Sequence, residues 1–200
     1  MADFTHYLLT RFDYPVDYPH LQKRIELFER FTLRSVANQT TSNFAWIIKT
    51  QLPELQHLGE ASKRIILADS FAIAASTPWV ITSRLDNDDA IHPEYIDRVQ
   101  ECFREQTEAI DSLGYRLNDA TGEFVNFDYY DSVRCSPFVS LIEQTTRAAT
   151  VMRYKHGQIG NHVPTRQIKS RLWCQVIHGT NKLMRWKPGF RSCPRPDWLP

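Results

Sequence analysis

Short apolar runs alternate with longer segments of helical periodicity along the first half of the chain. The apolar runs are rich in β-branched and aromatic residues, as strands are. They lie at residues 4–12, 44–49, 64–67 and 80–84. Between them, residues 21–38 space apolar residues three or four apart, which predicts a helix, and we expect short helices at 52–61 and 69–75. Strands that alternate with helices form parallel sheets covered on both faces, so we expect an α/β fold.

The second half of the chain mixes the two patterns. An amphipathic stripe predicts a helix at residues 93–110. A turn at residues 118–122 separates two apolar runs, at 114–117 and 124–130, which predicts a β-hairpin.

The stretch after residue 135 is less regular. Ser136 and Pro137 are typical of a helix start, and the apolar stripe that follows continues the helical spacing. This stripe consists of Phe138, Leu141, Ile142 and Thr145. Beyond it we expect a strand at residues 149–154, a loop at 155–170 and a last strand at 172–177.

Composition places the chain among globular proteins of one domain. It has 200 residues, of which 42% are hydrophobic and 24% charged, so disorder is not expected. No apolar run approaches the roughly 18 residues of a membrane span, and the N-terminus lacks a basic segment followed by an apolar one. The four cysteines contain no Cys-x-x-Cys pair, which fits reduced thiols. We therefore expect a cytoplasmic protein.

The charge is divided unevenly between two parts of the chain. Residues 1–150 hold 14 Lys and Arg against 22 Asp and Glu, a net of −8, whereas residues 151–200 hold 10 against 1, a net of +9. Such asymmetry points to an anionic partner for the C-terminal part, either a diphosphate, a membrane surface or nucleic acid. The alternative is that this part folds back on the acidic body.

The most informative stretch follows the fourth predicted strand. Arg84 and then Asp86, Asn87, Asp88 and Asp89 come directly after an apolar run. Like charges this close repel one another, and a fold tolerates them most easily when a cation lies between them. The alternative is a polar turn in which one of the aspartates caps the next helix.

An EF-hand calcium loop fits this stretch poorly. Counted from Asp86, the sixth position is Ile91, where a glycine is needed, and the twelfth is Asp97, where a glutamate is needed. Ligands of open α/β sheets bind beyond the carboxyl ends of the strands. The acidic stretch is therefore expected to meet the residues that end the first two strands, Thr10, Arg11 and Lys49.

Several motifs carry a resemblance to a known family. They are HYLLTRF, ERFTLRSVANQT, TSRLDNDDAI, SPFVSLIE and VIHGTN, and they extend to about residue 182. They resemble the family of bacterial glycosyltransferases named "putative rhamnosyltransferase", of the GT-A type. The resemblance implies a GT-A-like nucleotide-diphospho-sugar transferase fold. This fold has a mostly parallel central sheet with helices on both faces and a small β-hairpin region.

The resemblance also implies an activity and a domain organisation. A metal-dependent enzyme would move a sugar, rhamnose in the family's name, from a nucleotide-diphosphate donor to a bacterial glycan or other surface polysaccharide, including a lipid-linked acceptor. Residues 1–182 would form one catalytic domain, with a nucleotide-sugar-binding half at 1–91 and an acceptor-side half at 92–182. Residues 183–200 would form a basic, poorly structured tail that can contact an anionic membrane at its inner face.

Particular residues receive roles from this resemblance. Asp86 and Asp88 would hold Mn²⁺ or Mg²⁺, because hard cations prefer carboxylate oxygens. His178 would be the third ligand, with His156 and His162 as alternatives. The expected donor-binding residues are Thr10, Arg11, Arg84, Asp86 and Asn87, and the planar guanidinium groups among them suit phosphate.

The catalytic base would be Glu143, within SPFVSLIE, with Asp131 in reserve. For Glu143 the alternative is a solvated position on a helix. The aromatic side chains of Tyr129, Tyr130 and Trp173 can stack on sugar rings or belong to the core.

One departure from the GT-A pattern leaves nucleotide selection open. Many GT-A enzymes carry an acidic residue after the second strand, where this chain has Lys49, Thr50 and Gln51. Two other functions remain as alternatives. One is a non-catalytic module with a GT-A-like fold that binds sugar nucleotides or glycans, and the other is a phosphohydrolase or nuclease. Nucleic acid is not the expected partner.

Overall fold

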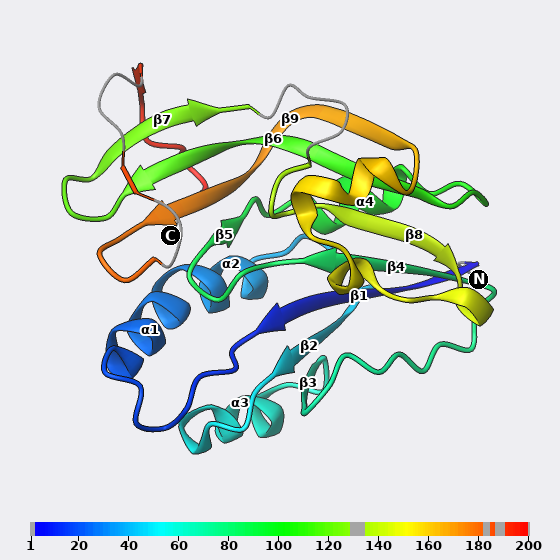
Figure 1. Cartoon of the computed structure of the whole chain (residues 1–200), viewed down its shortest axis with the longest axis horizontal. Helices are drawn as coiled ribbons and strands as arrows, with labels where there is room; N and C mark the ends of the chain where they lie inside the picture. Colours follow the sequence, from blue (N-terminus) through cyan, green and yellow to red (C-terminus); the bar gives the residue numbers. More distant parts are fainter. Residues whose placement is uncertain (1–2, 129–134, 182–184, 187–190, 200) are drawn as a thin grey trace.

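The computed structural model describes residues 3–128, 135–181, 185–186 and 191–199, and the strands within these ranges form one ten-stranded mixed sheet. The strand order is β10-β7-β6-β8-β4-β1-β2-β3, and β9 pairs with β5 and β6. Figure 1 shows the first four strands in the lower part of the molecule and the long β6 and β9 ribbons above them. The predicted α/β class is confirmed, since the sheet carries helices beside its parallel strands.

The first four strands are parallel, as the alternating pattern predicts. They are β1 (Phe4–Arg11), β2 (Ala45–Lys49), β3 (Ile65–Ala68) and β4 (Trp79–Arg84). The strand β1 lies at the centre of this group, between β4 and β2. Its carboxyl end and that of β4 therefore meet at one edge of the sheet.

The predicted helix at residues 21–38 forms with a local irregularity. It consists of α1 (Leu21–Leu27), a π-helical segment (Phe28–Leu33) and α2 (Arg34–Ala37) in continuous succession. The helix predicted at 52–61 is also confirmed, as a 3-10 turn (Pro53–Leu55) followed by α3 (Gln56–Ala61). Segments of π-helix are rare and often mark functional sites.

Two other helix predictions need correction. The helix α4 spans only Tyr95–Glu101, and the end of the predicted segment belongs to β6 (Glu108–Asn118), which pairs with β7, β8 and β9. These ladder hydrogen bonds override the helical spacing. Residues 69–75 form no helix either. In that segment Phe71, Ile73 and Ala75 alternate with more exposed alanines and pack on the sheet, which is the period of an extended chain.

The two faces of the parallel sheet are covered differently. The apolar residues of the three segments α1, α3 and α4 join one core cluster with the side chains that β1, β2 and β4 direct to that face. The opposite face is covered by residues 71–75 and by 3-10 turns at Val151–Arg153 and His156–Asn161. Helical segments thus lie on both faces, but on the second face they are short 3-10 turns. The strand predicted at 149–154 is therefore wrong.

The segment after Ser136 is a strand and not the predicted helix. The strand β8 (Ser140–Gln144) lies antiparallel between β4 and β6 and is buried on both faces, apart from its last residue. A strand buried on both faces shows no alternation of polar and apolar residues, so its pattern is easily mistaken for a helical one.

The predicted hairpin is confirmed, with β7 at Glu123–Phe127 and a positive φ of 72° at Gly122 in the turn. The last predicted strand is longer than expected, because β9 spans Thr165–Ile177 and takes up the end of the predicted loop. The short strand β5 (Ala90–Ile91) follows the acidic stretch and pairs with β9.

The C-terminal residues do not match the predicted unstructured tail. The strand β10 (Ser192–Cys193) pairs with β7, and Leu199, which is 5% exposed, packs in a core cluster with Leu27 and Phe31. For residues 191–199 the structure favours the alternative in which the basic part folds back on the body. Residues 183–184, 187–190 and 200 lie outside the described ranges. Within the described ranges, no helix has the length and apolar character that crossing a bilayer requires.

Candidate functional site

A polar cleft of about 460 Å³ opens beyond the carboxyl ends of β1 and β4. This is the edge at which the sequence predicts a ligand. Three arginines and four aspartates line its wall, so the cleft can contact both an anion and a cation. Its lining residues are Arg11, Asp13, Tyr14, Arg24, Arg84, Asp86, Asn87, Asp88, Asp89, Pro137, Met152, His156, Gln175 and Asn181.

The acidic stretch is held in place from three sides. The Thr32 hydroxyl, in the π-helical segment, donates to the carbonyl oxygen of Asp89 at 2.8 Å. The carboxylate of Asp89 accepts the backbone N–H of Val176 in β9 at 2.7 Å, and the amide of Asn87 donates to the carbonyl oxygen of Arg11 at 2.6 Å. Asp89 therefore anchors the stretch to β9 and does not cap the following helix.

Asp89 is 2% exposed, and its burial raises its pKa well above the usual range for an aspartate. The charges of Asp88 and Asp86 act in the same direction. This repulsion is the physical reason why the stretch needs a positive charge beside it.

That positive charge comes from Arg24. The Nη1 atom of Arg24 lies 2.7 Å from Oδ2 of Asp88 and 2.9 Å from Nε2 of His178, and those two atoms are themselves 2.8 Å apart. The side chains of all three residues are 8% exposed or less. The structure thus brings Asp88 and His178 together, as predicted, around a guanidinium group that the sequence analysis missed.

A visible feature of the pattern points to Arg24. It follows Leu21 by three residues and precedes Ile25 and Phe28, so it lies on the apolar face of its helix. A charged residue on such a face is almost never fully buried unless it is paired. Burial alone would lower the pKa of Arg24, but the charges of Asp88 and Tyr14 raise it overall, so the group stays charged.

Tyr14 is a second residue that the sequence analysis missed. Its hydroxyl accepts a hydrogen bond from Nη2 of Arg24, and the guanidinium carbon lies 5.1 Å from the centre of its ring. Tyr14 belongs to the proline-containing segment after β1, which carries no periodic pattern. Asp13 in the same segment lines the cleft and pairs with Lys49 at 2.5 Å.

Asp86 and Arg84 pair with each other at the mouth of the cleft. Oδ1 of Asp86 accepts from Nε and Nη2 of Arg84, each at 3.2 Å. Asp86 therefore does not converge with Asp88 and His178, and the described residues contain no group of three or more acidic, histidine or cysteine side chains placed to hold a metal ion. One carboxylate and one imidazole still fit Mg²⁺ or Mn²⁺, because these ions commonly take their other ligands from water and substrate phosphate.

Two buried polar atoms beside the cleft lack a partner within the described part of the chain. They are Nε of Arg24, a donor, and Oδ1 of Asn87, an acceptor. Both residues line the cleft, and their side chains are otherwise hydrogen-bonded. Buried atoms left unpaired are costly, so a cleft that contains one of each kind is suited to a polar ligand.

Two predicted site residues lie outside the cleft. Thr10 is fully buried, and its hydroxyl accepts from Nε1 of Trp46 at 2.9 Å, so it supports the core and not a donor. Glu143 faces Val80 at the amino end of β4, six residues before Asp86, and accepts the N–H of Thr150 at 3.1 Å. This position keeps Glu143 out of the cleft lining, whereas the sequence predicts a base beside the donor, and Glu143 is a strand residue instead of a solvated helix residue. The reserve candidate, Asp131, lies outside the described residues, as do Tyr129 and Tyr130.

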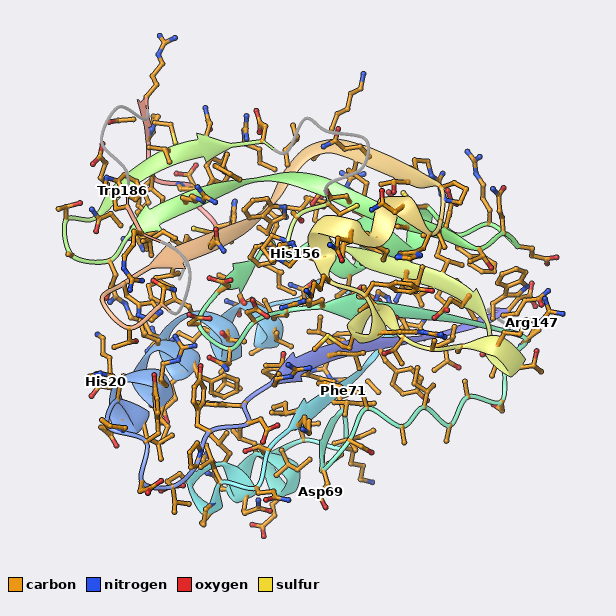
Figure 2. The ribbon with its side chains drawn as sticks, viewed as in Figure 1. His20, Asp69, Phe71, Arg147, His156 and Trp186 are labelled. Carbon is orange, nitrogen blue, oxygen red and sulfur yellow. The ribbon has the colours of Figure 1, made fainter. Side chains whose placement is uncertain are left out.

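The remaining candidates fall into two groups. His156, labelled near the centre of Figure 2, lines the cleft, and its Nδ1 lies 3.2 Å from the carbonyl oxygen of Cys135. A carbonyl only accepts, so Nδ1 carries the proton and Nε2 has the lone pair in the neutral ring. Burial lowers the pKa of His156, which favours this neutral form. By contrast, His162 packs on Tyr154, and Trp173 stacks on Phe138 in the core.

Known structures show a related fold. Two crystal structures of S. aureus TarS match 86% of this chain, with TM-scores of 0.52 and 0.50 and sequence identities of 10% and 9%. The chain spans 37% of the first TarS chain and 60% of the second, which is titled TarS 1-349. At this identity the likeness concerns the fold, and it agrees with the GT-A-like class that the sequence predicts.

Sequence comparison identifies the family. No curated protein matches the chain. The family described as "Putative rhamnosyl transferase" matches residues 8–67 and 54–189, which together include every residue of the cleft. This chain therefore belongs to that family of rhamnosyl transferases.

Proposed function

We propose that the protein is a glycosyltransferase whose cleft binds the diphosphate of a nucleotide-sugar donor. The sugar, rhamnose by the family's description, would pass to a glycan or lipid-linked acceptor of surface polysaccharide synthesis. Family membership supports sugar transfer. The observation that supports this cleft as the donor site is the meeting of Arg24, Asp88 and His178 beside two unpaired buried polar atoms.

The arginines of the cleft would hold the diphosphate. Arg11 is exposed at the carboxyl end of β1, and Arg84, at the end of β4, pairs with the partly exposed Asp86. Guanidinium groups bind phosphate oxygens through two parallel hydrogen bonds, which fixes the orientation of the leaving group. The unpaired Oδ1 of Asn87 would accept from a donor hydroxyl or amide.

The proposed cofactor is Mn²⁺ or Mg²⁺. Asp88 and His178 would hold it directly, and Asp86 would reach it through water or the diphosphate. When bound, the ion supplies positive charge that stabilises the departing diphosphate. The protein's own contribution is to hold Asp88 and His178 buried and in contact, through the anchors that Thr32 and Asp89 provide.

The acceptor hydroxyl needs a group to take its proton in an inverting reaction. Asp131 keeps that role as a prediction, since Glu143 is too far from the cleft. The cytoplasmic location and the contact of the basic tail with an anionic membrane likewise remain predictions.

A panel of nucleoside diphosphates, assayed for thermal stabilisation of the protein with Mn²⁺ and with chelator, tests the proposal. We expect one nucleotide to raise the unfolding temperature in a Mn²⁺-dependent manner, because ligands that bind only the folded state stabilise it. The matching nucleotide sugar should then be hydrolysed or transferred. Stabilisation without turnover of any sugar nucleotide would instead favour the non-catalytic binding module, and absence of both would contradict the donor site.

A further inference from the structure

A guanidinium group occupies the place where the proposed function puts a metal ion. Nη1 of Arg24 contacts both candidate ligand atoms, Oδ2 of Asp88 at 2.7 Å and Nε2 of His178 at 2.9 Å. Nδ1 of His178 accepts the backbone N–H of Thr180 at 3.2 Å, so Nε2 carries the ring proton and donates to Oδ2 of Asp88 at 2.8 Å. In that tautomer Oδ2 of Asp88 accepts from two donors, Nη1 of Arg24 and Nε2 of His178.

The guanidinium and a divalent ion need the same electron pairs. A metal ion binds through a carboxylate oxygen, and Oδ2 of Asp88 is the oxygen to which Arg24 donates; the imidazole can bind the ion only after Nε2 gives up its proton. A second cation would also bring like charge to a group that is 8% exposed, where solvent screens poorly. The two cations therefore exclude each other at this pair.

Arg24 is placed so that it can leave the pair without losing every partner. Its side chain lines the cleft, Nη2 is held by the Tyr14 hydroxyl, and Nε is unpaired within the described part of the chain. A diphosphate in the cleft offers oxygens to the donors that would be freed. Arg24 would thus lose a carboxylate and gain a phosphate, so its charge stays compensated.

We propose that Arg24 is an internal counter-cation that a divalent metal ion replaces at Asp88 and His178, and that the released guanidinium binds the donor diphosphate. This inference rests on the proposed function. It explains why the buried carboxylate is compensated in the metal-free chain. It also makes the binding of metal and of donor mutually reinforcing. The metal ion releases the guanidinium that binds the diphosphate, and the diphosphate holds that guanidinium away from Asp88.

Mn²⁺ binding, measured from the electron paramagnetic resonance signal of the free ion, tests this competition. The key variant is Arg24→Met, which removes the competing cation. Arg30→Met is its matched control, since Arg30 is on the same helical segment, is exposed and pairs with Asp119 away from the cleft. Both changes alter the net charge equally, so a general electrostatic effect would appear in both.

We expect Arg24→Met to bind Mn²⁺ about ten-fold more tightly than the wild type, while Arg30→Met is unchanged. With saturating Mn²⁺, Arg24→Met should bind the nucleoside diphosphate about ten-fold more weakly, because one phosphate ligand is gone. Adding Asp88→Asn to the Arg24→Met variant should abolish the tight Mn²⁺ binding, and this loss would place the ion at Asp88. Arg24→Met binding Mn²⁺ no more tightly than the wild type would overturn the inference.

A measurement on the wild-type protein covers the case in which Arg24→Met does not fold. The ¹⁵N nuclear magnetic resonance signal of the Arg24 side chain, identified by its loss in Arg24→Lys, should shift when Mg²⁺ is added. An unchanged signal under Mg²⁺ saturation would overturn the inference and leave the proposed metal site standing. If no variant binds Mn²⁺ and sugar transfer resists chelator, both the inference and the metal part of the proposed function fail, while the transferase assignment survives.

Discussion

The two ends of β4 each hold a buried carboxylate, but they hold it differently. At the carboxyl end Asp88, 6% exposed, is bonded to the side chains of Arg24, His178 and Asn181. At the amino end Glu143, 7% exposed, accepts the backbone N–H groups of Ala149 and Thr150. Burial alone does not distinguish the two residues.

The difference lies in what the partners can do. Side chains can rotate away and make room for a ligand, whereas backbone amides are fixed by the path of the chain. The side chain of Asp88 also borders a cleft with unpaired polar atoms, and that of Glu143 does not. A carboxylate held by exchangeable partners is therefore a candidate site, and one held by backbone amides is part of the scaffold.

The largest effect is expected from exchanging the two carboxylates for their amides. Asp88→Asn should lower the rate of sugar transfer at least about 100-fold, because it removes the charge that holds the cation. Glu143→Gln should leave transfer near the wild-type rate. Initial rates measure both, with the nucleotide sugar that the nucleoside diphosphate panel selects. Equal losses in the two variants would contradict the distinction, and Asp3→Asn, exposed at the amino end of β1, controls for surface charge.

A smaller effect, on stability, is expected when Glu143 loses its acceptor atoms altogether. Glu143→Ala leaves the N–H of Thr150 without its carboxylate partner, so we expect a loss of about 1–3 kcal/mol in the free energy of unfolding. Glu143→Gln keeps an acceptor oxygen and should lose much less. Urea unfolding of both variants measures this difference. A large loss of transfer by folded Glu143→Ala would instead bring this residue back into the site.

The support of the acidic stretch gives a third prediction. Thr32→Val keeps the shape of a fully buried side chain but removes the hydroxyl that bonds to Asp89, so we expect a loss of about 1 kcal/mol. Mn²⁺ affinity should fall with it, because the stretch is then less firmly placed. Thr146→Val, at an exposed position, is the control. Unchanged Mn²⁺ affinity would show that the stretch does not depend on this anchor.

The smallest expected effect is on the pH dependence of stability. Burial raises the pKa of Glu143, with the two backbone hydrogen bonds opposing this only in part. The folded protein therefore binds this proton more tightly than the unfolded chain, so stability falls as pH rises from the usual glutamate range through the raised pKa. Glu143→Gln cannot titrate and should flatten the curve in that window. Parallel curves of unfolding free energy against pH would contradict the shift.

Much of the parallel half follows from the sequence alone. The four strands from residues 4 to 84 can be predicted because they are compact apolar runs. The helix after the first strand can be predicted because one of its faces is polar. The strand β8 and the start of β6 are not visible, because both are buried on two faces and owe their conformation to neighbours far along the chain. The residues at 71–75 have the period of a strand but join no strand of the sheet within the described chain. Their path is set by packing and by the Tyr7 hydroxyl, which donates to the carbonyl oxygen of Ala74 at 2.9 Å.

The site divides in the same way. The acidic stretch Asp86–Asp89 at a strand end is a local pattern, and it was sufficient to indicate the edge at which negative charge collects. The partners of that stretch come from residues 57 to 90 positions away, since Arg24 and Thr32 reach it from a helix and His178 from the end of β9. Glu143 shows the converse. Its motif, SPFVSLIE, indicated a site residue, but the fold places Glu143 at the amino end of β4, opposite the cleft.

The sequence by itself thus determined the sheet of the first half and the edge at which charge collects, because both depend on neighbouring residues. Only the tertiary structure decided which side chains meet there. Contacts between distant residues depend on strand order and on the face that each helix presents, and the sequence pattern does not specify either.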